Sequence, residues 1–167
     1  APNIAPRQRA GATPEQLWKE MILEAKSKET TDSLPPIIAT DISPEAIENA
    51  HSNAIAAGVA PYITFKACDF ADTPIPEQKG CIFFNPEYGI RLGDPKELAP
   101  VYERIGTFLH EKCRGYMGGL ITGNPELSHL VNLYYRTRIP FFNGPIDCRL
   151  FLYEGCELKG EHVNGHQ

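Results

Sequence analysis

Apolar and polar residues follow two different periods along this chain. Short apolar runs bounded by glycine, proline or acidic residues are typical of buried strands, and they occur at 36–40, 62–67, 81–84 and 116–122. Between these runs, apolar residues recur at helical spacing. Because strand and helix patterns alternate, we predict an α/β fold with a mostly parallel, doubly wound sheet.

Three of the predicted helices begin with the same kind of capping sequence. A Thr-Pro, Ser-Pro or Asp-Pro pair stands at 13–14, 43–44 and 94–95, which places a capping side chain before a proline at the first helical position. The apolar stripe of the first helix, including Trp18, is expected to pack on a core. Gly58 is expected to end the second helix in a left-handed conformation.

The end of the chain predicts an antiparallel edge to the sheet. Two strand-like segments, 139–142 and 146–153, flank Asn143-Gly144, which is a strong hairpin signal. Residues 1–155 are therefore assigned to one domain. Residues 156–167 are expected to form a polar, frayed tail.

The composition narrows the class of protein. The chain has 167 residues, 42% of them hydrophobic and 22% charged, as in an ordinary globular domain. It has no apolar run of membrane-spanning length and no leader pattern, so a cytoplasmic location and no membrane partner are expected. Five cysteines without C-x-x-C spacing indicate buried free thiols, and the scattered histidines predict no metal site.

The net charge of the chain is unfavourable for binding nucleic acid. A formal net charge of −5 argues against a self-sufficient nucleic-acid binder, which depends on clustered lysine and arginine. If the substrate is RNA, its backbone is expected to be held mainly by regions outside this chain. No feature of the sequence indicates an oligomeric state.

The candidate chemistry lies where three of the predicted strands end. The run Gly80–Phe84 reads as a strand buried on both faces and leads into Asn85-Pro86-Glu87-Tyr88, while Asp41 and Asp69 follow two other strands. Because parallel strands end at the same edge of a sheet, these side chains are expected to line one crevice. There, Asp41 can accept hydrogen bonds from ribose hydroxyls and Asp69 from an adenine amino group. Each aspartate, taken alone, is also what a turn or helix cap requires.

In order and spacing, these segments resemble the THUMP-associated RNA methyltransferases, which include the bacterial large-subunit rRNA guanine-N2 methyltransferases. The similarity covers nearly the whole chain. The matching segments are Asn3-Ile4-Ala5-Pro6, Asp41-Ile42-Ser43-Pro44, Asp69-Phe70, Asn85-Pro86-Glu87-Tyr88-Gly89 with Arg91-Leu92-Gly93, Thr122–Leu127 and Asn143–Leu150.

The resemblance implies a Rossmann-like fold and S-adenosylmethionine as cofactor. It also implies a role for each matching residue. Asn85, Pro86 and Tyr88 are the implied catalytic residues: the Asn85 amide oxygen and the Pro86 carbonyl would accept the hydrogens of an exocyclic amine, and the Tyr88 ring would stack on an extruded base. The implied cofactor-binding residues are Asp41, Ile42, Asp69, Phe70 and Asn85.

Two departures from the family pattern stand beside this agreement. Glu87 occupies the position of a second proline, which keeps a backbone carbonyl but frees φ and adds a charge. The glycine-rich strand and turn that hold the methionine part of the cofactor are absent. That strand belongs between the Asp41 and Asn85 strands, so residues 1–155 are expected to be a partial domain with a gap in its sheet.

The sequence therefore predicts a cytoplasmic methyltransferase acting on guanine N2 in rRNA. Adenine-N6 methylation of RNA or DNA is the alternative within the enzymes, since the same acceptor geometry serves both amines. A non-catalytic module that retains the fold for RNA or protein contact is the alternative outside them, and both departures favour it.

Overall fold

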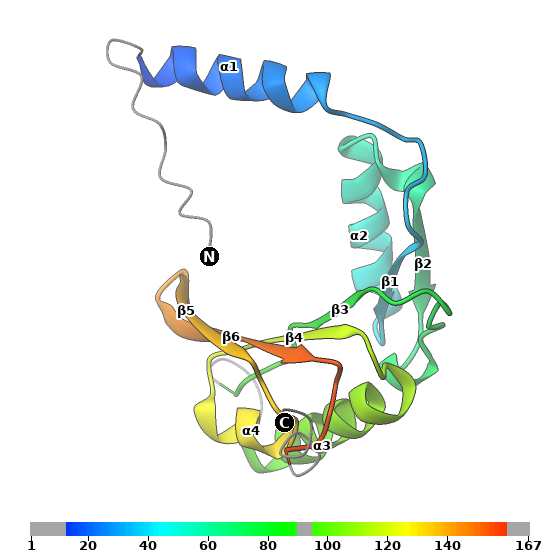
Figure 1. Cartoon of the computed structure of the whole chain (residues 1–167), viewed down its shortest axis with the longest axis vertical. Coiled ribbons are helices and arrows are strands. Elements are labelled where there is room, and N and C mark those ends of the chain that lie inside the picture. Colours follow the sequence, from blue (N-terminus) through cyan, green and yellow to red (C-terminus); the bar gives the residue numbers. More distant parts are fainter. Residues whose placement is uncertain (1–12, 90–94, 160–167) are drawn as a thin grey trace, which may run out of the picture. The chain divides into compact units, whose positions relative to one another are not determined.

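The computed structural model describes residues 13–89 and 95–159, and the chain divides into two units, 1–36 and 37–167 (Figure 1). The elements, in chain order, are α1 (Pro14–Ser27), β1 (Ile37–Asp41), α2 (Pro44–Ala56), η1 (Ala60–Tyr62), β2 (Ile63–Ala67), η2 (Phe70–Asp72), β3 (Cys81–Phe84), α3 (Pro95–Lys112), β4 (Met117–Thr122), α4 (Pro125–Leu130), β5 (Thr137–Asn143) and β6 (Ile146–Glu154). In the described part of the chain, no helix has the length and apolar character needed to cross a membrane.

The first unit contains the predicted first helix. A complete capping box starts α1: Thr13 accepts from the Gln16 backbone, and the Gln16 side chain accepts from the Thr13 backbone. The expectation that its stripe packs on a core is wrong, because no residue of α1 is buried and Trp18 is 62% exposed. The described residues of this unit hold no second helix or strand on which the stripe could pack.

The second unit begins with a strand, a helix and a strand, as predicted. Strand β1 pairs in parallel with β2, from Ile37 opposite Ile63 to Asp41 opposite Ala67. Helix α2 connects them, starts at the Ser43 cap and is followed by Gly58 at φ +74°, so the predicted helix end is confirmed.

The rest of the second unit is a four-stranded sheet in the order β3-β4-β6-β5. Strands β3 and β4 are parallel, and β6 runs antiparallel to β4 and β5, as the predicted hairpin requires. Helices α3 and α4 lie on the same side of this sheet (Figure 1). The buried core between them consists of Tyr102, Ile105, Phe108, Leu109, Cys113, Tyr116, Leu120, Leu127, Val131, Leu133, Phe151, Tyr153 and Cys156.

The strands form two sheets instead of one. Among the described residues, no strand hydrogen-bonds both to the β1–β2 pair and to β3. The prediction that β3 is buried on both faces is wrong: Cys81 is exposed and Phe83 is 58% exposed, while Ile82 and Phe84 are half-buried. Strand β3 has one strand partner and a helix layer on one side, so alternate side chains remain uncovered.

Two details near the end of the chain also differ from expectation. The hairpin turn is centred on Gly144-Pro145, with Gly144 at φ +60°, and Asn143 is the last residue of β5. Residues just after 155 are packed and not frayed, since Cys156 is fully buried and Leu158 bridges to Leu133. The remaining tail lies outside the described residues.

The cysteines are free thiols, as predicted, although their burial varies. Cys113, Cys148 and Cys156 are buried, whereas Cys81 is exposed. Burial raises the pKa of Cys113 to about 11 and of Cys156 to about 12, so both remain protonated at neutral pH.

Candidate functional site at the strand ends

The first predicted site residue, Asp41, is the last residue of β1 and lies opposite Ala67 of β2. Its backbone carbonyl accepts from Cys68 at 2.9 Å, which continues the β1–β2 ladder to the start of the Asp69 turn. Its Oδ1 accepts from the Ser43 backbone N–H at 2.8 Å. Ile42 beside it is 74% exposed. An exposed carboxylate next to an exposed apolar side chain suits a ligand with both a sugar and a flat ring.

The second residue, Asp69, follows β2 and is engaged on one oxygen. Its Oδ1 accepts from Ala71 N–H at 2.9 Å and from Arg104 Nη2 at 2.7 Å. The Arg104 hydrogen bond, followed by the Ala71 backbone bond, lowers the pKa of the Asp69 carboxyl below its ordinary value. The guanidinium also lies over the Phe70 ring, 4.9 Å from its centroid.

An aromatic cluster brings the second and third strand ends together. The rings of Phe70 and Phe84 meet edge to face with centroids 5.4 Å apart, and both meet Phe108 of α3 at 5.7 and 6.0 Å. Phe70 follows Asp69 and Phe84 precedes Asn85 in the sequence. The two polar groups are thus attached to one packed cluster, although they belong to different sheets.

The loop after β3 carries the three predicted catalytic residues. Asn85 is exposed, and Pro86 and Tyr88 are half-buried. The Tyr88 hydroxyl accepts from Asn143 Nδ2 at 3.2 Å, so the tip of the β5–β6 hairpin contacts this loop. Glu87 is exposed, and its backbone carbonyl accepts a hydrogen bond from the Tyr102 hydroxyl at 3.1 Å.

Sequence reasoning missed the residues that hold this site from a distance. From the sequence, neither Arg104 nor Tyr102 is predicted as a site residue, and Asn143 belongs to the hairpin signal and to a segment that matches the family. Each reaches a site residue far away in sequence: 35 residues separate Arg104 from Asp69, and 55 separate Asn143 from Tyr88. No local pattern encodes such contacts.

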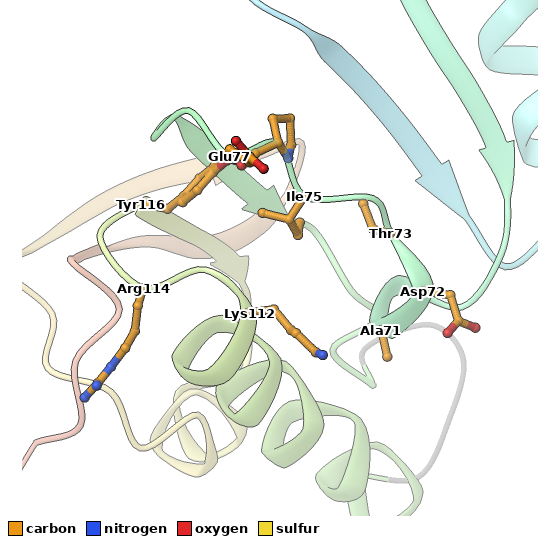
Figure 2. A pocket seen from close by; sticks show the side chains of 9 residues that line it. Ala71, Asp72, Thr73, Ile75, Glu77, Lys112, Arg114 and Tyr116 are labelled. Atoms are coloured by element: carbon orange, nitrogen blue, oxygen red, sulfur yellow. Dashed lines mark hydrogen bonds between the residues drawn. The ribbon is translucent and has the colours of Figure 1, made fainter.

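A hollow in the described part of the second unit lies elsewhere. It has a volume of about 510 Å³ and lies between the segment from Ala71 to Glu77 and the end of α3, where Lys112 and Arg114 stand (Figure 2). None of Asp41, Asn85 and Tyr88 lines it. The candidate site is assigned to the strand ends because they carry the carboxylate and amide acceptors that a nucleoside requires, and Phe70 and Phe84 join two of these ends.

The described residues fit the nucleoside half of the expected cofactor. Among the described residues, hydrogen bonds engage Oδ1 of Asp41 and Oδ1 of Asp69, so the second oxygen of each carboxylate can still accept a hydrogen bond from a hydroxyl or an amino group. Ile42 offers an apolar surface for a ring. Across residues 13–89 and 95–159, His, Cys, Asp and Glu form no group of three arranged to hold a metal ion.

The chain resembles known methyltransferases over most of its length. Residues 2–151 match the RMKL-like methyltransferase domain family. A relative named ribosomal RNA large subunit methyltransferase K/L, from Methylococcus capsulatus, is 34% identical over 141 residues, which is 83% of this chain and 19% of the relative. The chain thus spans about a fifth of the length of the named relatives it matches.

Solved structures give the same fold. A possible methylase from Clostridium difficile 630 has a TM-score of 0.72 and 28% identity, over 84% of this chain and 37% of that chain. A predicted N6-adenine-specific DNA methylase from Listeria monocytogenes has a TM-score of 0.68 and 25% identity, over 85% and 36%. These matches confirm the Rossmann-like methyltransferase fold, and the chain belongs to the family of RMKL-like methyltransferase domains, whose methyl donor is S-adenosylmethionine.

Proposed function

We propose that this chain forms the nucleoside-binding and methyl-acceptor corner of an RNA methyltransferase that modifies the exocyclic N2 amine of a guanine in rRNA. The observation that carries the proposal is the junction of Phe70 with Phe84, because it attaches the Asp69 and Asn85 strand ends to one cluster. The rRNA methyltransferase relatives support the substrate class. An rRNA substrate in turn fits the cytoplasmic location expected from the sequence.

The cofactor side of the site consists of the two carboxylates and their neighbours. The unoccupied carboxylate oxygen of Asp41 would accept from the ribose hydroxyls, and that of Asp69 from the adenine amino group, with Ile42 and Phe70 as apolar neighbours. When bound, S-adenosylmethionine supplies an electrophilic methyl group. The protein residues serve to place the base against it.

The acceptor side is the exposed loop after β3. The Asn85 side-chain oxygen and the Pro86 carbonyl would accept the two hydrogens of the guanine amine, which draws electron density onto the nitrogen and aims its lone pair. The Tyr88 ring, held by Asn143, would stack on the extruded base.

The domain assignment completes the proposal. Among the residues that the structure describes, β1 and β3 each have one hydrogen-bonded neighbour, which is what a missing parallel strand between them would leave. We propose that residues 1–155 are part of a domain whose glycine-rich strand and turn lie in other sequence. Most of the grip on the RNA backbone would also come from outside, in keeping with the net charge of −5.

Transfer of tritium from labelled S-adenosylmethionine to unmodified large-subunit rRNA, measured with the parent protein that contains this chain, tests the mechanism. Asn85→Ala should reduce incorporation by about 100-fold, because an acceptor aimed at the reacting amine is removed. Asn49→Ala, the same change at an exposed position of α2, is the matched control and should retain full activity. Equal incorporation by the Asn85 variant and the unaltered chain would remove the proposed mechanism.

Adenine-N6 methylation is the second candidate within the enzymes. The Listeria structure with that name supports it, and two acceptors beside a stacking ring suit either amine. Digestion of the product to nucleosides separates the two, since N2-methylguanosine and N6-methyladenosine differ on chromatography and mass spectrometry.

A non-catalytic module is the remaining candidate, favoured by Glu87 and by the two separate sheets. Titration calorimetry with S-adenosylhomocysteine distinguishes it. A chain that binds none at millimolar concentration is not an independent methyltransferase.

A further inference from the structure

The loop that bears Asn85 is held from the core side by a buried tyrosine of α3. Tyr102 is 0% exposed, and its hydroxyl lies 3.1 Å from the Glu87 carbonyl oxygen and 2.9 Å from Thr122 Oγ1. Thr122, at the end of β4, is 1% exposed. One hydroxyl therefore joins the loop after β3 to the end of the neighbouring strand.

The direction of these hydrogen bonds follows from their chemistry. A carbonyl only accepts, so Tyr102 must donate its single hydrogen to Glu87. Thr122 then donates to Tyr102, which is the shorter of its two options, since the Asn124 carbonyl lies at 3.4 Å. Thr122 in turn accepts from the Asn124 backbone N–H at 3.1 Å. The result is a series of hydrogen bonds in which Asn124 donates to Thr122, Thr122 donates to Tyr102, and Tyr102 donates to Glu87.

These hydrogen bonds remain intact at neutral pH. Burial raises the pKa of Tyr102 to about 12, so its hydroxyl keeps the hydrogen that it donates to Glu87. Breaking the bond would leave a buried hydroxyl and a carbonyl without their partner, which is unfavourable. The Glu87 peptide is thereby fixed although residue 87 has no proline ring to restrict φ.

We propose that Tyr102 is a positioning residue for methyl transfer: its bond to Glu87 fixes the Glu87–Tyr88 peptide, one residue beyond Pro86, and thereby keeps the Asn85 and Pro86 acceptors aimed at the amine. The inference rests on the proposed function. Tyr102 acts through the loop and does not itself touch the substrate.

The chain offers a matched control for removing this hydroxyl. Tyr153 is also buried, at 1% exposed, and its hydroxyl has no hydrogen-bond partner among the described residues. Tyr102→Phe and Tyr153→Phe therefore delete the same atom from the same core. Only the first deletion removes a contact to the acceptor loop.

The test combines hydrogen exchange with methyl-transfer kinetics on the parent protein that contains this chain. In Tyr102→Phe, the amides of the segment 87–89 should exchange about 10-fold faster, and kcat should fall about 10-fold with KM for the methyl donor unchanged, because one buried hydrogen bond is lost. Tyr153→Phe should change neither quantity. A purely structural role would lower thermal stability without this division between kcat and KM.

A pair of threonine variants keeps the test open if Tyr102→Phe does not fold. Thr122→Val removes the hydroxyl that supports Tyr102 and should reduce kcat about 3-fold. Thr122→Ser keeps it and should restore kcat close to that of the unaltered chain.

Unchanged exchange at 87–89 in Tyr102→Phe would overturn the inference, and so would faster exchange with an unchanged kcat. A parent protein that contains this chain and transfers no methyl group counts against the proposed function alone, because the exchange measurement tests the Tyr102 contact by itself.

Discussion

The two parts of the second unit contribute opposite sides of the candidate site and are built differently. The carboxylate layer, residues 37–72, contains β1, α2 and β2, and Ala54 is its only buried residue. The helix-covered sheet, from β3 to β6 with α3 and α4, encloses the whole of the described core cluster. Large apolar side chains of the carboxylate layer stay exposed, including Ile55 at 60% and Ile37 at 43%.

The difference shows which physical terms stabilise each side. Apolar burial, the dominant favourable term in folding, is concentrated in the helix-covered sheet. The carboxylate layer depends on its strand ladder, its helix caps, and a few contacts to the other part, such as Arg104–Asp69 and Phe70–Phe84. The loop after β3, which carries the proposed acceptor Asn85, is thus supported by a packed core. The proposed nucleoside-binding side is stabilised mainly by local hydrogen bonds.

The largest expected difference in stability between the two parts appears when one aliphatic side chain is truncated in each. Leu109, in α3, is 0% exposed and Ile55, in α2, is 60% exposed. Leu109→Ala should lower the free energy of unfolding by roughly 2–5 kcal/mol, and Ile55→Ala by no more than about 0.5 kcal/mol. Urea titration measures both. Equal losses would show that the carboxylate layer is packed as well as the other part.

Two glycines extend the comparison to backbone effects. A Cβ on Gly106 would lie 2.1 Å from the Val131 carbonyl oxygen, where α3 meets α4, so Gly106→Ala must push two backbones apart. We expect it to cost about 1–3 kcal/mol. Gly58→Ala meets open space but keeps φ at +74°, and should cost about 1–2 kcal/mol. Thermal unfolding measures both, and a tolerated Gly106→Ala would contradict close packing of α3 on α4.

Helix caps give a smaller and more local difference. Ser43 accepts from Ala46 N–H at 3.3 Å, and Asn124 accepts from Glu126 and Leu127 at 3.0 and 3.2 Å. Replacing either by alanine should cost about 1 kcal/mol.

The two caps should differ in where that loss appears. Since α2 lacks core support, Ser43→Ala should accelerate hydrogen exchange within α2 alone, whereas Asn124→Ala should lower global stability. Ser43→Thr keeps the cap and is the control. A global loss in Ser43→Ala would contradict independent opening of α2.

The smallest effect is the pH dependence of the contact between the two parts. Because Arg104 and Ala71 lower the pKa of Asp69, this contact stabilises the fold above the ordinary carboxyl value of 3.8 and is lost as pH falls through the lower folded value. Arg104→Gln should raise the pKa of Asp69, as NMR titration measures. The change in stability should stay below about 1 kcal/mol, since the Arg104 side chain is 51% exposed.

Arg136→Gln is the matched control for this titration. Arg136 is a partly exposed arginine that pairs with Glu154 at 3.1 Å. Its replacement should leave the pKa of Asp69 unchanged. A similar rise of that pKa in both variants would show that the shift comes from overall charge and not from the Arg104 contact.

Local sequence was sufficient for most elements. The capped starts of α1 and α2, the left-handed Gly58 and the strand that ends at Asp41 all follow from neighbouring residues. The order of the polar strand ends along the chain also followed from sequence, whereas their meeting in one crevice remains a prediction, because β1 and β2 form a separate sheet from β3. The roles of the site residues remain predictions.

Burial could not be derived in the same way. The apolar run at 81–84 predicts a fully buried strand, yet Phe83 is 58% exposed because, in the described part of the chain, α3 and α4 cover only one face of the sheet (Figure 1). The predicted burial of Trp18 was wrong in the same way. An apolar stripe shows which face of a helix could pack on a core, but it does not show which surface that face contacts.

The sequence by itself therefore determined the elements, their order and the residues at the strand ends, because caps, turns and periodicity act over a few residues. The tertiary structure alone decided which of those residues are held and by what. Arg104 on Asp69, Tyr102 on Glu87 and Asn143 on Tyr88 join residues remote in sequence, and such contacts exist only once sheets and helices have packed.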